Sequence, residues 1–93
     1  VKLEDLTEGA PIERELMLIK IKASGTQRSE VKRVADIFRG QVVDLTSSVF
    51  TVQLTGTEEK LDAFIAALGD NPVLEVARTG VSGISRGEKT LSL

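Results

Sequence analysis

The chain has 93 residues, and its 12 basic and 14 acidic side chains give a formal net charge of −2. This charge provides no broad positive field that would attract nucleic acid or an anionic membrane. An apolar share of 41% and a charged share of 28% are typical of one folded domain rather than a disordered segment. The absence of Cys and His excludes disulfides, thiolate nucleophiles, the commonest metal ligands and the usual proton shuttle at neutral pH, so we expect no cofactor.

Turn formers interrupt the start of the chain. Residues 1–6 alternate like the end of a strand, and residues 7–11 include Gly9 and Pro11, which favour a linker. The uncharged, partly apolar run at residues 49–56 is far too short to span a bilayer. We therefore expect a cytoplasmic protein that does not contact a membrane.

The first strong pattern is a strand at residues 14–22, whose apolar side chains fall on both faces. Two sets alternate along it: Met17, Ile19 and Ile21 on one face, and Leu16 and Leu18 on the other. A strand covered on both sides is typical of the centre of a sheet, and its second face is expected to meet a partner subunit. Periodicity alone does not decide which set faces the helices.

An amphipathic helix follows the first strand. Its apolar positions recur at helical spacing and are Val31, Val34, Ala35 and Phe38. We expect the helix to end near Arg39, with Gly40 in the left-handed position just beyond it.

The rest of the chain predicts a hairpin, a second helix and a last strand. Residues 41–48 and 49–55 form the hairpin, Thr57 caps a helix that ends before Gly69, and residues 73–79 form the strand. The order β-α-β-β-α-β predicts an α+β, ferredoxin-like two-layer sandwich, in which a four-stranded antiparallel sheet carries two helices on one face.

Two groups of side chains are candidates for chemistry. The Gly-rich tail at residues 80–89, with Arg78 and Arg86 nearby, is a weak candidate for an anion site, since it matches no phosphate-binding motif and a structural turn explains it better. Glu13 and Glu15 share a strand face, but ordinary ion pairing explains them better than acid–base catalysis. The expected partners are Arg14, Lys20 and Lys22.

The aromatic residues argue against an RNA-binding sheet of this topology, which needs exposed aromatic side chains on its central strands. The chain has three aromatic residues, and all fall on predicted core faces: Phe38, Phe50 and Phe64. No enzyme hypothesis has a nucleophile or a base to support it.

Several blocks of sequence are more informative than any single motif. They include IERELMLIK at residues 12–20, DIFRGQVVD at 36–44 and FTVQLTG at 50–56. Shorter blocks continue in the same order at residues 60–64, 75–80 and 85–87. Together these blocks closely resemble the C-terminal domain of the bacterial acetolactate synthase small (regulatory) subunit, from about residue 12 to residue 89.

This resemblance implies a non-catalytic subunit of acetolactate synthase, an enzyme of branched-chain amino acid biosynthesis. In that family the small subunit activates the thiamine-diphosphate-dependent catalytic large subunit and confers feedback inhibition. A valine-type effector binds between ACT domains that precede the segment seen here. Residues 1–11 are accordingly expected to be a linker and a remnant of an ACT domain, and residues 12–93 the C-terminal domain.

The resemblance also implies a dimer, which would cover the second face of the first strand. The candidate subunit interface comprises Arg14, Leu16 and Leu18. The alternative function is a small-molecule or anion-binding module that uses the Gly-rich tail or a cleft between subunits.

Overall fold

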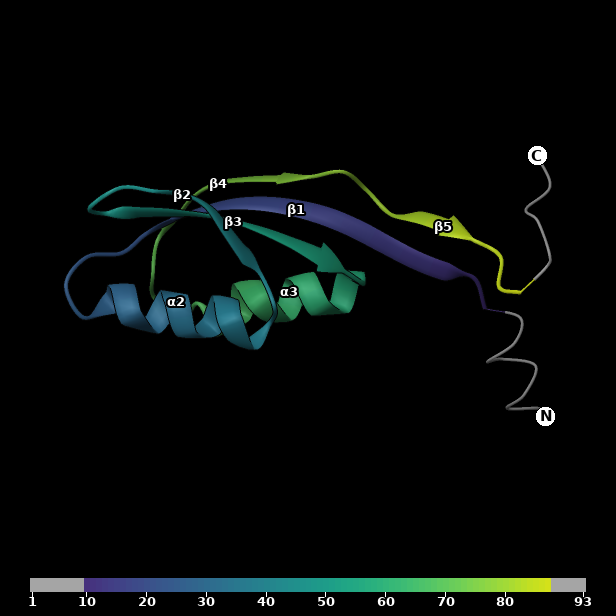
Figure 1. Cartoon of the computed structure of the whole chain (residues 1–93), viewed down its shortest axis with the longest axis horizontal. Helices are drawn as coiled ribbons and strands as arrows, with labels where there is room; N and C mark the ends of the chain where they lie inside the picture. The colour runs from purple at the N-terminus through teal and green to yellow at the C-terminus, as the bar shows by residue number, and fades with distance from the viewer. Residues whose placement is uncertain (1–9, 88–93) are drawn as a thin grey trace.

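Two helices pack on one face of an antiparallel sheet in the computed structural model, which describes residues 10–87 (Figure 1). The described elements are β1 (Ile12–Lys22), α2 (Gln27–Ile37), β2 (Gln41–Leu45), β3 (Val49–Gly56), α3 (Glu58–Ala67), β4 (Val73–Arg78) and β5 (Ser82–Ile84). The main sheet has the order β2-β3-β1-β4. This is the predicted ferredoxin-like arrangement, and the α+β prediction is confirmed.

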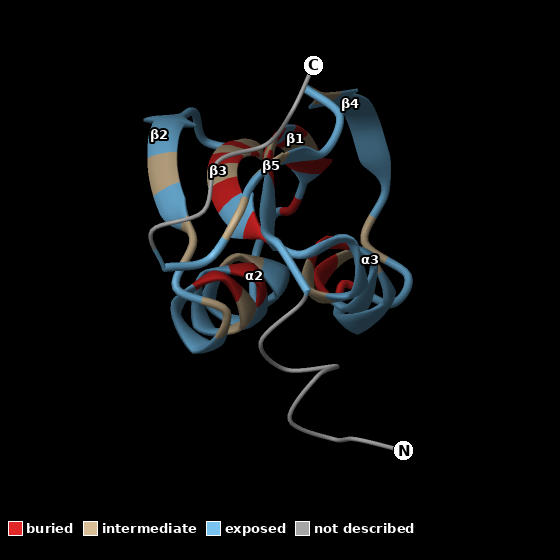
Figure 2. Ribbon diagram, turned by 90° about the vertical axis from the view of Figure 1, so that its right-hand side faces the viewer, coloured by how far each residue is buried: buried red, intermediate tan, exposed pale blue. Residues whose placement is uncertain are grey.

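The central strand pair is regular along its whole length. β1 runs antiparallel to β3 from Glu15 opposite Gly56 to Lys22 opposite Val49. Figure 2 shows α2 below the side of the sheet that carries β2 and β3, and α3 below the side that carries β4. The rings of Phe38 and Phe64 meet edge to face between the helices, with centroids 5.5 Å apart.

The core lies between the sheet and the helices, and it settles which face of β1 is internal. Met17, Ile19 and Ile21 are completely buried against the helices, whereas Leu16 and Leu18 lie on the opposite, open face. The buried apolar side chains are Met17, Ile19, Ile21, Ala23, Val31, Ala35, Phe50, Val52, Leu54, Leu61, Phe64 and Leu68.

The end of α2 differs from the prediction in one detail. The helix ends at Ile37, and the left-handed residue is Arg39, with φ of 62°, rather than Gly40. A Cβ on Gly40 would come within 2.9 Å of Cγ1 of Val52. Position 40 therefore requires glycine for its close approach to β3, and the left-handed turn falls on the residue before it.

A fifth strand corrects the predicted four-stranded sheet. Within the Gly-rich tail, β5 pairs with the first residues of β1, from Ile12 opposite Ile84 to Arg14 opposite Ser82. Between β4 and β5 the chain has one residue more than the part of β1 that it faces, which shifts the pairing register by one. This bulged segment contains Gly80, with φ of 87°. The β1–β5 pair extends beyond the helices as an arm (Figure 1).

Candidate functional site

The open face of the sheet holds the predicted interface leucines. Leu18 is 40% exposed and lies between Gln53 on β3 and Ala77 on β4. Leu16 is half-buried on the same face. A shallow depression of about 190 Å³ is lined by Leu18, Ile19, Lys20, Thr51, Glu75 and Ala77.

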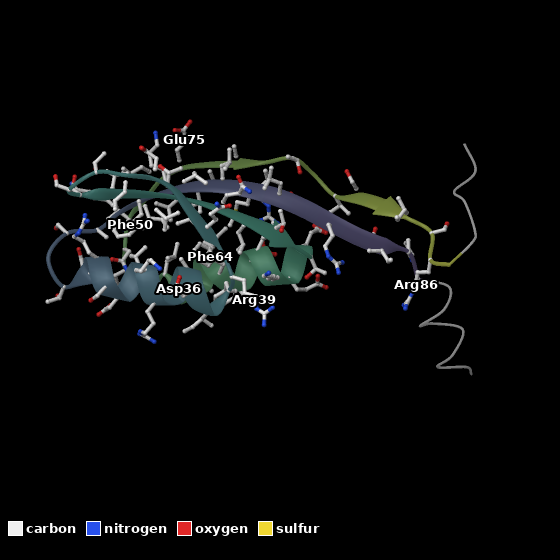
Figure 3. All side chains as sticks on the ribbon, viewed as in Figure 1. Asp36, Arg39, Phe50, Phe64, Glu75 and Arg86 are labelled. Carbon is white, nitrogen blue, oxygen red and sulfur yellow. The ribbon has the colours of Figure 1, made fainter. Side chains whose placement is uncertain are left out.

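One ion pair borders this depression. Nζ of Lys20 lies 3.1 Å from Oε1 of Glu75, which stands on the side of the sheet away from the helices (Figure 3). Both side chains are well exposed, so the pair adds little stability. A leucine and an alanine surrounded by neutral side chains and one neutralised charge pair form a surface suited to packing against protein.

Arg14 lies apart from the two leucines. It has the same parity along β1, but it belongs to the arm, where its neighbour is Ser82 of β5. Its guanidinium donates a hydrogen bond of 2.7 Å to the carbonyl oxygen of Glu13. The structure thus brings Leu16 and Leu18 together and places Arg14 at one end of that surface.

A polar network on the helix side joins β1, β4 and α3. Glu15 is 6% exposed, and its carboxylate accepts hydrogen bonds from Nε and Nη2 of Arg78 at 3.1 and 3.0 Å. The Gly80 N–H donates to the same carboxylate at 3.2 Å. Nη1 of Arg78 also donates to Asp62 of α3 at 2.8 Å.

This network corrects the expected pairing of Glu15 with Arg14, Lys20 or Lys22. Glu15 shares the parity of Met17 and Ile19, so it faces the core, and its partner comes from a strand distant in sequence. The sequence signal for this pairing was the position of Glu15 on the same face of β1 as Met17 and Ile19, because a carboxylate on a buried face requires a cation beside it.

The network shifts the ionisation of both partners. Hydrogen bonds from Arg78 lower the pKa of Glu15, and the positive charge of Arg78 and the Gly80 N–H act in the same direction. Burial and the nearby Asp62 oppose this effect. Hydrogen bonds from Arg78 to Glu15 and Asp62 raise the pKa of Arg78 above its ordinary value. Both groups are therefore charged at neutral pH.

The two arginines of the predicted anion site occupy different parts of the chain. Arg78 ends β4, where two carboxylates already neutralise its guanidinium, and Arg86 follows β5 at the far end of the arm (Figure 3). The anion site stays a prediction that this geometry does not favour. Within residues 10–87, no group of three or more acidic, His or Cys side chains could hold a metal ion, and no helix is long and apolar enough to cross a membrane.

Comparison with known proteins decides the family. The sequence profile described as the small subunit of acetolactate synthase matches residues 14–87. The chain belongs to the acetolactate synthase small-subunit family. The predicted resemblance is confirmed.

Relatives in this family match nearly the whole chain. It is 54% identical over 92 residues to the acetolactate synthase isozyme 3 small subunit of Salmonella typhimurium, and the match covers 98% of this chain and 56% of that protein. It is 41% identical over 92 residues to a probable acetolactate synthase small subunit of Methanothermobacter thermautotrophicus, covering 98% of this chain and 55% of that protein. The chain thus spans just over half the length of these small subunits.

A solved small subunit has the same fold. The crystal structure of the acetolactate synthase small subunit from Thermotoga maritima matches with a TM-score of 0.80 and 32% identity, over 92% of this chain and 52% of that one. The predicted boundary at residue 11, with a remnant of a preceding domain before it, falls mostly on residues 1–9, outside the described part of the chain.

Proposed function

We propose that this chain is the C-terminal domain of a regulatory, non-catalytic subunit of acetolactate synthase. The observation that carries the proposal is the family match over residues 14–87, together with 54% identity to a named small subunit. The residues present agree with a non-catalytic role, because the sequence has neither His nor Cys and its buried carboxylate, Glu15, is paired with Arg78.

The partner of such a subunit is the catalytic large subunit. The domain would couple effector binding elsewhere in the small subunit to that partner, which requires a defined interface and no chemistry of its own. A valine-type effector would bind in the ACT domain expected before residue 12, and the complex would function in the cytoplasm.

The open face supplies the contact that holds two small subunits together. Leu16 and Leu18 form its apolar centre, with Arg14 at one end, and a homodimer would bury them. Support comes from the partial exposure of Leu18 on a central strand, beside Ala77 and the half-buried Leu16, because a group of exposed apolar side chains favours contact with another protein.

Reconstitution with a purified catalytic subunit tests the proposed function. The chain alone is expected to show no turnover, to activate the catalytic subunit only slightly, and to confer no inhibition by valine. A whole small subunit that contains this domain serves as the control and should both activate and confer inhibition. Strong inhibition by valine with this chain alone would contradict the assignment of the effector site to the preceding domain.

A further inference from the structure

The two edges of the main sheet differ in how well they are protected. Exposed strand edges pair readily with other chains unless charges, bulges or short length prevent it. On β2, the register shifts between Val42 and Asp44, which leaves Val43 as a bulge and places a carboxylate beside it. The β2 edge is thus interrupted at its centre.

The β4 edge lacks this protection along its regular part. Its bulge falls at Leu74, near its start, and the register is continuous from Glu75 to Arg78. Val73, Leu74 and Val76 are 39%, 51% and 42% exposed. On β2, Val43 and Leu45 are similarly exposed, at 47% and 51%, so the uninterrupted register from Glu75 to Arg78 is what makes β4 the edge more suited to pairing.

Both charged side chains of β4 are held by its own chain. Glu75 pairs with Lys20 of β1 on the open face, and Arg78 pairs with Glu15 and Asp62 on the helix side. Charges on an edge strand normally repel an incoming strand. Here they are neutralised by neighbours inside the fold, which leaves Val76 and Ala77 as an uncharged centre.

The backbone at this centre has free hydrogen-bonding groups. The Thr79 N–H donates a hydrogen bond of 3.0 Å to the Leu16 carbonyl. Two residues earlier on β4, Ala77 lies opposite Leu18 in the same register. Antiparallel ladders alternate, so the N–H and C=O groups of Thr79 and Ala77 point toward β1. Those of Val76 and Arg78 point toward the open edge.

We propose that β4 pairs antiparallel with β4 of a second copy, across a two-fold axis at Val76 or Ala77. Charge decides among the registers, because like charges directly opposite each other are destabilising. A two-fold at Glu75 would oppose two carboxylates, and one at Arg78 would oppose two guanidinium groups. Centres at Val76 and Ala77 avoid both arrangements.

The occupant is a second copy because the edge is complementary to itself. A two-fold axis perpendicular to the sheet keeps every buried face on the same side, so the strands of both copies form one continuous sheet. The open faces then also point the same way. The contact at β4 is therefore separate from the proposed contact through Leu16 and Leu18, and it does not depend on the proposed function.

Disulfide trapping tests the pairing directly, since the chain has no cysteine of its own. Opposed residues in antiparallel strands have Cα atoms about 4.5 or 5.5 Å apart, within or near the range of a disulfide. Val76→Cys or Ala77→Cys is expected to cross-link into dimers under mild oxidation. Val43→Cys, on the β2 edge, is the matched control and should not form the cross-link.

A backbone variant gives an independent measurement. Val76→Pro removes an N–H that faces the open edge and leaves the hydrogen bonds between β4 and β1 intact. Combined with Ala77→Cys, it should abolish the cross-link. The urea midpoint of this double variant should stay close to that of Ala77→Cys alone. Leu18→Asp should leave the cross-link in place, which separates this contact from the open face. The proposal is overturned if neither Val76→Cys nor Ala77→Cys cross-links, if Val43→Cys cross-links equally fast, or if Leu18→Asp abolishes the cross-link.

Discussion

Glu15 is the buried acidic residue of the described chain, and its environment explains why it is tolerated there. Its carboxylate accepts two hydrogen bonds from Arg78 and one from the Gly80 N–H. A carboxylate without these partners would be costly to bury. The pair also secures β1 to β4 at the point where the arm begins.

The pH dependence of stability should report this pair. Pairing with Arg78 lowers the folded-state pKa of Glu15 below its ordinary value of 4.5. The pair therefore stabilises the folded state fully above pH 4.5. This stabilisation is lost as the pH falls from 4.5 through the lowered pKa of the folded state. Glu15→Gln should reduce the urea midpoint at pH 7 and flatten its decline below pH 4.5. Glu13→Gln, at an exposed neighbour, is the control and should keep the wild-type profile. An unchanged profile for Glu15→Gln would contradict the assigned role.

Adjacent residues after α2 should respond in opposite directions to substitution. Gly40→Ala places a Cβ 2.9 Å from Cγ1 of the buried Val52, so we expect a loss of about 1–3 kcal/mol of unfolding free energy. Arg39→Gly relieves a left-handed conformation, with φ of 62°, and should be neutral or stabilise by up to about 1 kcal/mol. Urea denaturation measures both, and a stabilising Gly40→Ala would refute the close-approach argument.

At the scale of elements, the two helices begin differently. Oγ1 of Thr57 accepts a hydrogen bond of 3.2 Å from the Lys60 N–H at the start of α3. Thr26 precedes α2 but makes no such side-chain bond. The same residue type therefore caps one helix and only precedes the other.

Matched alanine variants test this difference. Thr57→Ala should cost about 0.5–2 kcal/mol of unfolding free energy because it removes the cap. Thr26→Ala should change it by less than about 0.5 kcal/mol, as for an ordinary surface site. Equal losses in urea denaturation would show that the Thr57 bond adds nothing.

The elements recognisable from sequence were those with a local signal. Alternation and helical spacing identified β1, α2, β3 and α3, because each buries one side against the core. Apolar and β-branched residues bounded by turn formers identified β2 and β4. β5 was missed since its three residues, Ser82–Ile84, are ordered by pairing with β1 and carry no period of their own. Periodicity likewise separated the two faces of β1 but could not identify the inner one, which depends on where the helices pack.

The candidate site was predictable only in part, for a similar reason. Leu16 and Leu18 were recognised as a second apolar face by their parity. The partner of Glu15 is Arg78, 63 residues away, and no local pattern connects them. The left-handed Arg39 was also missed, because the close approach of Gly40 to Val52 exists only in the folded protein.

At the scale of the whole molecule, the sheet carries the two surfaces that we propose for assembly. One is the open face around Leu18, and the other is the β4 edge around Val76. They point in different directions, so a second subunit on one leaves the other accessible. Two such surfaces agree with the proposed role of the domain, which is to hold subunits together within an enzyme complex.

The central claim is that the open face is a subunit interface, and sedimentation equilibrium tests it most directly. Leu18→Asp should lower the weight-average mass of the chain across a concentration series, since burying a leucine is worth about 1.5–3 kcal/mol and an unpaired carboxylate resists burial. Ile37→Asp, at a 63% exposed apolar residue of α2, is the control and should keep the wild-type mass. A Leu18→Asp chain that associates as strongly as the wild type would contradict the account.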